Sequence, residues 1–564
     1  MTSDGEPGTA GAGPTGPGPL AGGGGNLRGQ RAAGLAAVRR EFALEARQGR
    51  GGRGAQERYA DHMDAVVRQL VEAARAHTAR PLVVCALGGY GRRTLCLHSD
   101  IDLMILFEDA IGRDEERFVN AVFQPLWDLQ LVVGHQIREL KDFDELDTGN
   151  TEFLLAVLDA RPLAGDEGLF ERVKTRVTDL DAGDRERAIG ALLELVESRQ
   201  AQFNGTIYQL EPDIKNAPGS LRDITAIRYL QTLGGERLEA DRARTAGVLQ
   251  ESEDFLLRIR AVLHAESGRD ANTLTHELQE RVAEAMGCAG DGARPRVEAL
   301  MGAYFRCARS IARALGRSQR AARPAGERQA PAPLGRHFEI ADDGIRFLDP
   351  DTAAARPALW VEIFRLALAD GCAVSEQALD CMEANLDRFA ADDFVGTDGE
   401  RQQLLNLFHP RPGLYARLSE MHDCGLLNRI LPELEGIHCR VIRDFHHKYT
   451  VDEHTLLTIR GLEALWNPAT PGRRRFGTLL EELREPGHLA LALMFHDIGK
   501  AGDADHALES VRLARTALDR LEVRADARHT IDFRSVYATL LDQWLQVNPE
   551  ATLGGEFDRL PVFS

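Results

Sequence analysis

The spacing of apolar residues predicts a helix-rich chain with a small sheet near its N-terminal end. Residues 31–78 show helical periodicity and many arginines, and long stretches with a 3.6-residue period return from residue 152 to about residue 315. Between them, apolar runs of β type at residues 82–87 and 101–107 predict two strands. The fold class expected from this pattern is α+β and predominantly helical.

A segment rich in Pro, Ala and Arg separates the first helical region from a second one. Residues 317–333, RSQRAARPAGERQAPAP, have the composition of a linker. Helical periodicity then resumes and continues to about residue 521. The first 25 residues are rich in Gly, Pro and Ala and lack an apolar core, so we expect a disordered tail and no signal peptide.

Composition narrows the class of protein. The 564 residues are 43% hydrophobic and 27% charged, which is ordinary for globular proteins, and the length suffices for three or four domains. A net charge of −19 argues against a general nucleic-acid-binding protein, because phosphate contacts need clustered Lys and Arg. It does not exclude a nucleotide substrate, whose phosphates can be met by metal ions and backbone amides.

Cysteine usage and hydropathy indicate the cytoplasm. The eight cysteines are scattered singly and form no C-x-x-C pair, so neither a zinc site nor a disulfide framework is indicated. Reduced, buried thiols are expected instead. No apolar run approaches the roughly 20 residues needed to span a membrane, so we expect a cytoplasmic protein without a membrane partner.

The strongest chemical signal lies at residues 88–103, GGYGRRTLCLHSDIDL. Side chains two positions apart on a strand point to the same face, so Asp100 and Asp102 are expected to project together. Two carboxylates this close repel each other and are best satisfied by a shared divalent metal ion. Gly88 and Gly89 allow backbone amides to approach a triphosphate. The segment therefore predicts a site for metal-assisted phosphoryl transfer.

A D-x-D pair alone usually marks only a solvated strand face, and the Gly-Gly turn upstream favours the functional interpretation. Together they are the pattern of the nucleotidyltransferase superfamily, which normally adds a third carboxylate on a later strand. The candidate strand, residues 132–138, offers His135 and no acid. Asp128 and Glu139 lie nearby, and the sequence does not place either of them on the metal-facing side.

Several motifs then resemble the bifunctional PII uridylyltransferase/uridylyl-removing enzymes: GGYGR, SDIDL and the following PLWDLQLVVGHQIREL. Residues 208–223 resemble the family's LEPNIKEGPGGLRD segment, and the resemblance runs from about residue 31 to about residue 522. Arg222 and Asp223 in that segment form a pair usually found at surfaces or helix caps, so no role is assigned to them. One departure is the family's G-R-G-E-L, which reads GRRTL at residues 91–95.

The resemblance implies roles for this first site. Asp100 and Asp102 would hold Mg²⁺ against UTP, while Gly88, Gly89 and Ser99 would cradle the triphosphate. The acceptor would be a tyrosine hydroxyl of the PII signal protein, which gives a uridylyl-tyrosine diester and pyrophosphate.

A second group of candidate residues lies toward the C-terminal end. TVDEH at residues 450–454 opens a predicted helix with the spacing of a capping box, and a later apolar helix ends in LALMFHDIGK at residues 491–500. A lone histidine is more often a satisfied structural residue, whereas an adjacent His-Asp pair is costly to bury without partners or metal. His454, His496 and Asp497 together therefore favour metal ligation.

H-D-I-G-K after an apolar helix resembles the HD phosphohydrolase superfamily. FHHKYTVDEHT and the later Asp505-His506 resemble the uridylyl-removing domain of the same bifunctional enzymes. The resemblance implies metal-assisted hydrolysis of the uridylyl-tyrosine diester, with Mn²⁺ or Mg²⁺ as the cofactor. It also makes His447 and Lys500 candidates for substrate binding. The superfamily needs one further aspartate on a later helix.

After about Val523 the sequence no longer resembles the family. Residues 532–538 resemble instead the C-terminal end of an uncharacterised, sulfatase-related secreted family, which suggests a truncated or chimeric reading frame. The last HD aspartate and the family's glutamine-sensing ACT domains are then missing. Weak uridylyl removal and indifference to glutamine are expected on this interpretation.

The expected organisation is a small mixed-sheet nucleotidyltransferase core followed by helical domains and an all-α HD domain. The expected boundaries are residues 1–30 for the tail, 31–150 for the nucleotidyltransferase domain, 151–316 for a helical domain, 317–335 for the linker, 336–440 for a connecting helical region, 441–523 for a partial HD domain and 524–564 for an unrelated tail.

Two alternatives remain open from the sequence. A tRNA nucleotidyltransferase also joins this transferase fold to an HD domain, although the acidic balance and the EPDIK and PGSLRD stretches speak against it. A degenerate scaffold that binds PII or nucleotide without turnover agrees with the missing third acid and the altered loop. The leading interpretation is an enzyme that transfers UMP from UTP to PII, without a DNA or membrane partner.

Overall fold

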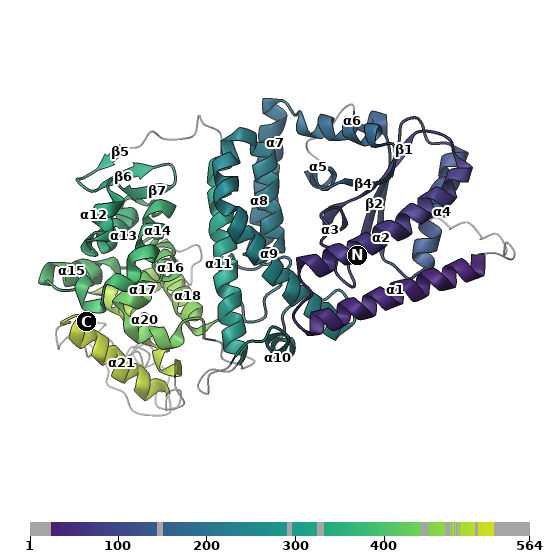
Figure 1. The fold of residues 1–564 in the computed structure, drawn as a ribbon. Helices are drawn as coiled ribbons and strands as arrows, with labels where there is room; N and C mark the ends of the chain where they lie inside the picture. The colour runs from purple at the N-terminus through teal and green to yellow at the C-terminus, as the bar shows by residue number, and fades with distance from the viewer. Residues whose placement is uncertain are drawn as a thin grey trace, which may run out of the picture.

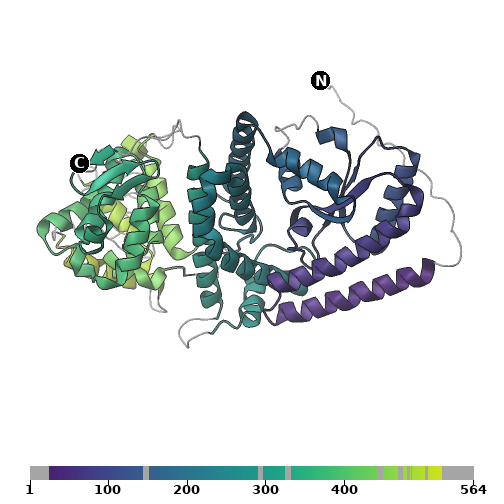
Figure 2. The same cartoon turned by 45° about the horizontal axis from the view of Figure 1, so that its top comes forward.

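The computed structural model describes residues 24–143, 151–289, 296–323, 332–440, 449–467, 485–501 and 506–523, together with positions 474, 476–478, 480 and 483. Figure 1 shows an elongated arrangement, with a sheet and its covering helices at one end and a second helical unit at the other. Long helices between residues 182 and 322 stand between these ends, and Figure 2 shows the same order from another side. The expectations for residues 1–23 and 524–564, and for His447 and Asp505, fall outside the described residues.

Four strands form a mixed sheet: β1 Leu82–Ala86, β2 Ile101–Phe107, β3 Val133–Glu139 and β4 Arg161–Gly165. Their order is β3-β2-β1-β4, with β2 and β3 parallel and the other neighbours antiparallel. The strands expected near residues 82–87, 101–107 and 132–138 are therefore present. The sequence pattern missed β4, because its five residues, RPLAG, include the weak strand formers Pro and Gly.

Side chains of the sheet alternate between two buried cores, as strand geometry requires. Leu103 and Ile105 of β2 face a core that they share with α1 Gly24–Arg47, α2 Arg53–Ala74 and α4 Arg113–Asp128. Met104 and Leu106 face the opposite core, which also contains residues of α5 Thr151–Leu158, α6 Glu167–Thr178 and the central helices. Asp102 lies on the same face as Met104, so the acidic pair opens toward the central helices.

Five helices form the middle of the molecule: α7 Ala182–Ala201, α8 Leu221–Gly234, α9 Glu239–Ser267, α10 His276–Ala285 and α11 Arg296–Ala322. Their apolar stripes share one buried core with a face of the sheet, so the sheet and these helices pack as one body. The start of the expected linker is helical instead, because Leu315, Ser318 and Ala322 continue the buried stripe of α11.

A small antiparallel sheet and a set of helices form the second unit. Strands β5 Ala332–Leu334, β6 Phe338–Ala341 and β7 Gly344–Phe347 pair in that order. The sequence predicted a linker at β5 and helices from residue 336 onward, and the helical prediction was wrong for β6 and β7. Strands of three or four residues are too short to show an alternating pattern, so periodicity gives no signal for them.

The helices of the second unit bury one further core of their own. They are α12 Pro350–Ala354, α13 Ala358–Asp370, α14 Glu376–Asn385, α15 Asp398–Leu407, α16 Leu414–Asp423, α17 Leu426–Ile430, α18 Val451–Glu463, α20 Pro486–Phe495 and α21 His506–Arg520. Short 3₁₀ helices lie at η1 Arg75–His77, η2 Leu140–Phe143, η3 Gly235–Leu238, η5 Leu386–Arg388, η6 Ala391–Phe394, η7 Pro432–Ile437 and η8 Ile498–Ala501.

This architecture confirms the predominantly helical α+β class. Within the described ranges, no helix has both the length and the apolar character that a membrane crossing requires. The eight cysteines all lie in described parts of the chain and are free thiols, of which four are buried and four are partly exposed.

Candidate functional site

The glycine-rich segment leaves β1 and folds into a single helical turn, α3 Gly88–Gly91. Leu87 donates its N–H to the carbonyl of Asp102 at 2.9 Å, which ties the turn to β2. Gly88 has a φ of +52°, a left-handed conformation that favours glycine. Thr94 closes the loop by donating its N–H and its hydroxyl to the carbonyl of Gly89, at 2.8 and 3.2 Å. The loop is therefore held directly beside the acidic pair.

The carboxylate of Asp102 lies in a narrow space between two glycines. A Cβ on Gly88 would lie 3.4 Å from Asp102 Oδ2, and a Cβ on Gly134, its partner residue on β3, would lie 2.2 Å from Asp102 Oδ1. Asp102 is partly buried and Asp100 is exposed. Burial and the neighbouring charge of Asp100 raise the pKa of Asp102. A cation shared by the two carboxylates would relieve this repulsion.

The described residues of β3 bring no third carboxylate to this face. His135 points to the opposite face, where its ring lies 5.1 Å from that of Phe123. Glu139 accepts a hydrogen bond from the N–H of Ile111 at 2.9 Å. On the face of Asp102 the strand carries Gln136, whose side-chain oxygen is buried without a hydrogen-bond partner. An amide oxygen therefore occupies the strand face on which the superfamily normally carries an acid.

A cleft of about 1040 Å³ opens in front of the acidic pair. All five residues predicted for the first site line it: Gly88, Gly89, Ser99, Asp100 and Asp102. The facing lining includes basic side chains to which the sequence analysis assigned no role: Arg199, Lys215, Arg222 and Arg260. The cleft therefore has the predicted Asp100 and Asp102 on one side and these four basic side chains, here called the basic wall, on the other.

Lys215 and Arg222 of the basic wall belong to the YQLEPDIK and PGSLRD segment, whereas Arg199 lies on α7 and Arg260 on α9. Asp213 Oδ1 accepts the backbone N–H groups of Lys215 and Asn216 at 2.8 and 2.9 Å, which shapes the turn. The buried Asp223 accepts the N–H of Gly219 at 2.7 Å and pairs with Arg199. Burial and nearby arginines lower the pKa of Lys215, whereas the charges of Asp270 and Asp100 oppose that shift. The local signal for these two basic residues was a Lys and an Arg close in sequence to Asp213 and Asp223.

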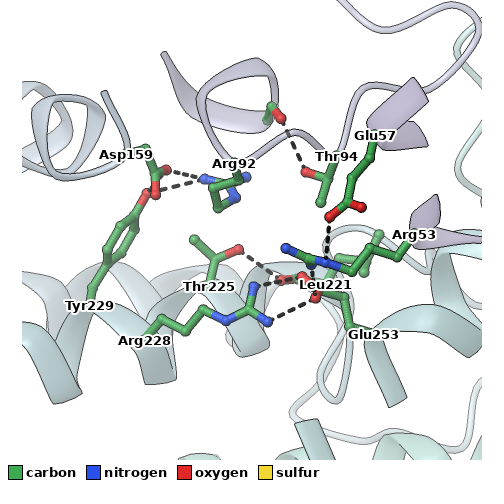
Figure 3. A network of polar contacts seen from close by, with 11 residues as sticks. Arg53, Glu57, Arg92, Thr94, Asp159, Leu221, Thr225, Arg228, Tyr229 and Glu253 are labelled. Carbon is green, nitrogen blue, oxygen red and sulfur yellow. Dashed lines mark hydrogen bonds and ion pairs between the residues drawn. The ribbon is translucent and has the colours of Figure 1, made fainter. Parts of the chain in front are cut away.

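Figure 3 shows the polar network that joins the loop to the central helices. Asp159 accepts hydrogen bonds from Arg92, which follows the glycine turn, and from the hydroxyl of Tyr229 on α8. Burial raises the pKa of Asp159, and the positive charge of Arg92 partly offsets that rise. On α9, Glu253 accepts two hydrogen bonds from Arg228, at 2.6 and 2.8 Å, and pairs with Arg53 of α2. The contacts of Asp159 hold the loop against α8, and those of Glu253 join α9 to α8 and α2.

The second predicted group also comes together. His454 lies in the first turn of α18, and its Nε2 is 3.7 Å from Asp497 Oδ2. His496 follows α20, and its Nε2 is 3.3 Å from the same oxygen. His496 Nδ1 lies 2.7 Å from the carbonyl of Leu493, a contact that favours the tautomer with its proton on Nδ1. The three donor atoms lie within 4.8 Å of one another.

Two details around this group differ from or extend the prediction. Thr450 is the N-cap of α18, but its side chain makes no capping hydrogen bond. The expected capping box is absent because Glu453 is buried and accepts a hydrogen bond from the hydroxyl of Tyr415 at 3.3 Å. Burial raises the pKa of Glu453 to about 7. Lys500 Nζ lies 2.8 Å from Asp497 Oδ2. Burial opposes ionisation of Asp497, but His496 and Lys500 outweigh it and lower the Asp497 pKa.

The donor sets of both groups fit divalent metal ions. Mg²⁺ is commonly held by one or two carboxylates together with substrate phosphates, which matches Asp100 and Asp102. Two imidazoles and a carboxylate suit a divalent transition metal, which matches His454, His496 and Asp497.

A glycine turn beside paired strand aspartates on a small mixed sheet defines a nucleotidyltransferase-type arrangement. Comparisons with known proteins make this specific, because residues 187–317, which carry the basic wall, match the family model described as GlnD PII-uridylyltransferase. The resemblance seen in the motifs is thereby confirmed.

Curated proteins named bifunctional uridylyltransferase/uridylyl-removing enzyme are similar over a longer stretch. The one from Azotobacter vinelandii (strain DJ / ATCC BAA-1303) is 31% identical over 445 residues, which cover 76% of this chain and 49% of that protein. The one from Methylococcus capsulatus is 29% identical over 484 residues, which cover 83% of this chain and 54% of that protein. This chain spans about half the length of the curated relatives it matches.

Proposed function

We propose that the chain transfers UMP from UTP to a tyrosine of the PII signal protein. The observation that carries this proposal is the cleft, in which the acidic pair and glycine turn share one cavity with Lys215 and Arg222. Those two residues belong to the stretch that matches the PII-uridylyltransferase model. Opposite charges on the two sides suit a triphosphate bound together with a divalent cation.

In the proposed reaction, the tyrosine oxygen attacks the α-phosphorus of UTP. The bond from that phosphorus to the bridging oxygen breaks, pyrophosphate leaves, and the phenolic proton passes to solvent. Asp100 and Asp102 would hold Mg²⁺, which neutralises phosphate charge when bound. Gly88, Gly89 and Ser99 would contact the triphosphate, and Lys215 would add positive charge near the leaving group.

The second group supports a hydrolytic activity toward the same bond. His454, His496 and Asp497 would hold Mn²⁺ or Mg²⁺, which assists the attack of water on phosphorus when bound. Hydrolysis would release UMP and restore the tyrosine hydroxyl. Lys500, at 2.8 Å from Asp497, and His447 would contribute to binding the diester. The proposed partners are UTP and PII, and the proposed location is the cytoplasm, without a DNA or membrane partner.

The test is a transfer assay with UTP labelled on the α-phosphate, offered with PII or with tRNA. We expect label on a tyrosine of PII, and its loss in Asp102→Asn. The matched control is Asp109→Asn, because Asp109 is an exposed acid just after the same strand and outside the cleft. Label on tRNA would support a tRNA nucleotidyltransferase instead, and label on neither acceptor would support a scaffold.

A further inference from the structure

Three metal-ligating side chains converge outside both groups described above. His422 lies near the end of α16, His438 directly follows η7, and Asp452 lies in the first turn of α18. One donor atom from each lies within 4.8 Å of the other two. The three residues belong to separate segments, so only the folded chain brings them together.

The distances match a shared cation. His422 Nε2 is 3.1 Å from Asp452 Oδ2, and His438 Nδ1 is 3.7 Å from the same oxygen. Ligand atoms at about 2.1 Å from a tetrahedral zinc ion are roughly 3.4 Å apart. The two observed distances, 3.1 and 3.7 Å, lie on either side of this ligand-to-ligand distance.

An ion pair between Asp452 and His422 does not account for the second imidazole, that of His438. Asp452 needs only one imidazole as a counter-ion, yet two imidazole rings lie with centroids 5.0 Å apart beside it. Both nitrogen atoms are buried, and neither makes a hydrogen bond of acceptable geometry. Neutral imidazole nitrogens offer lone pairs to a cation. Buried polar atoms without partners therefore point toward a missing ligand.

The Asp452 carboxylate is also held in place by hydrogen bonds, as metal-binding carboxylates usually are. Asp452 Oδ2 accepts the backbone N–H of Cys439 at 2.7 Å, and Oδ1 accepts that of Glu453 at 3.0 Å. The ring of Tyr208 packs against His422 with centroids 5.7 Å apart. The His422 and Asp452 side chains are only 2% and 7% exposed, and His438 is 28% exposed, so solvent reaches the cluster from the His438 side.

We propose that His422, His438 and Asp452 form a metal site of the zinc class, distinct from His454, His496 and Asp497. Two imidazoles and one carboxylate suit a borderline divalent ion such as Zn²⁺, and the fourth position is left to solvent. The ion would cross-link α16, the segment after η7 and α18. Because Tyr208 belongs to the segment that also carries Lys215, the site would lie where the central helices meet the second unit.

The experiment counts zinc sites in the full chain after chelator treatment. The background variant is His496→Ala, which removes a ligand of the other group. Zn²⁺ is titrated in competition with a chromogenic chelator. We expect one equivalent in this background, and an affinity at least about tenfold lower when His438→Ala is added. Adding His337→Ala is the matched control, because His337 lies beside Phe338 on the small sheet, away from both groups.

If His438 had only a structural role, replacing it would not change the zinc affinity. His438→Ala is chosen over a change at His422 because its side chain is partly exposed, and His438→Gln preserves most of the side-chain volume if the smaller residue disturbs folding. We also expect Zn²⁺ to raise the thermal midpoint of the His496→Ala background by a few degrees, and to lose that effect with either change at position 438. No zinc binding in the background, or equal affinity with and without His438, would overturn the proposal.

Discussion

At the scale of single residues, the space around Asp102 determines where its carboxylate can lie. Gly134 is its partner on the parallel strand β3, and it leaves room that any larger side chain would fill. The carboxylate would have to move because a Cβ at this position lies 2.2 Å from Oδ1. Catalytic groups tolerate such displacement poorly, since positioning supplies much of the rate.

We therefore expect Gly134→Ala to lower uridylyl transfer by roughly 10²-fold while the thermal midpoint changes little. Steady-state rates with labelled UTP and PII, together with calorimetry, measure both effects. Gly190→Ala is the matched control, because nothing lies within 4 Å of a Cβ built on that helical glycine. Full activity in Gly134→Ala would show that the position of Asp102 is not limiting.

Arg93 shows how this chain tolerates a departure from the family motif. It occupies the place of a glycine in the resembling G-R-G-E-L segment and has a φ of +60°, in the left-handed region. That conformation costs a non-glycine residue about 1 kcal/mol. Its ion pair with Asp61 is exposed to solvent, because the Asp61 side chain is 54% accessible. The pair therefore contributes little to stability.

Arg93→Gly is therefore expected to stabilise the protein by up to about 1 kcal/mol, read as a rise in the thermal midpoint. Arg93→Ala separates the two contributions, because it removes the ion pair and keeps the strained backbone. We expect it to be neutral or slightly destabilising. A lower midpoint in Arg93→Gly would mean that the Asp61 contact outweighs the backbone strain.

The sequence predicted one side of the cleft and not the other. Asp102 lies on β2 and Asp100 directly precedes that strand, so their closeness in the chain alone places them near each other. Lys215 lies more than 100 residues further along the chain, and only tertiary packing brings it to the cleft. The candidate strand for the third acid offers His135 and no acid, and its position on the strand turns His135 toward Phe123.

At the scale of elements, a buried ion pair anchors the glycine turn to its surroundings. Asp64 of α2 accepts two hydrogen bonds from Arg161 of β4, at 2.7 and 3.0 Å. The Arg161 guanidinium also lies 5.8 Å from the ring centre of Tyr90 and donates to the carbonyl of Gly91. The pair thus connects a helix, an edge strand and the loop.

Asp64→Asn leaves the Arg161 charge without its buried counter-ion, so we expect the free energy of unfolding to fall by about 2 kcal/mol. This is less than for a fully buried ion pair, because Arg161 is partly exposed. Differential scanning calorimetry should show a midpoint lower by several degrees. Asp61→Asn, on the same helix and largely exposed, should change the midpoint by less than about one degree. Equal effects from the two variants would refute the anchoring role.

Elements with strong local patterns were predictable, and short ones were not. β2 spans residues 101–107 as predicted, because six of its seven residues are apolar. β5, β6 and β7 have three or four residues each and were missed. Their pairing depends on a turn at Gly344, with φ +118°, and on packing against the second core. Long-range packing of this kind leaves no periodic signal in the sequence.

At the scale of the whole molecule, charged residues join the central helices to the second unit. Glu376 at the start of α14 contacts three arginines of α11: Arg313 at 3.2 Å, Arg317 at 3.3 Å and Arg320 at 3.2 Å. Arg313 also pairs with Asp380 and Glu383, at 2.7 and 2.6 Å. The main cores lie on either side of this contact, so its strength governs how firmly the two units are held together.

Glu376→Gln removes the only charge that all three arginines share in this contact, and their mutual repulsion then remains. We expect faster hydrogen exchange in α14 and in the last turns of α11. The increase should correspond to a fall of about 1–2 kcal/mol in the free energy of local opening. The difference between variant and wild type should shrink as salt is raised, because screening weakens both attraction and repulsion. Glu383→Gln is the control: its side chain is half exposed and pairs with Arg313 alone in this cluster, so exchange should change much less. Unchanged exchange in Glu376→Gln at low salt would show that apolar packing, and not this cluster, holds the two units together.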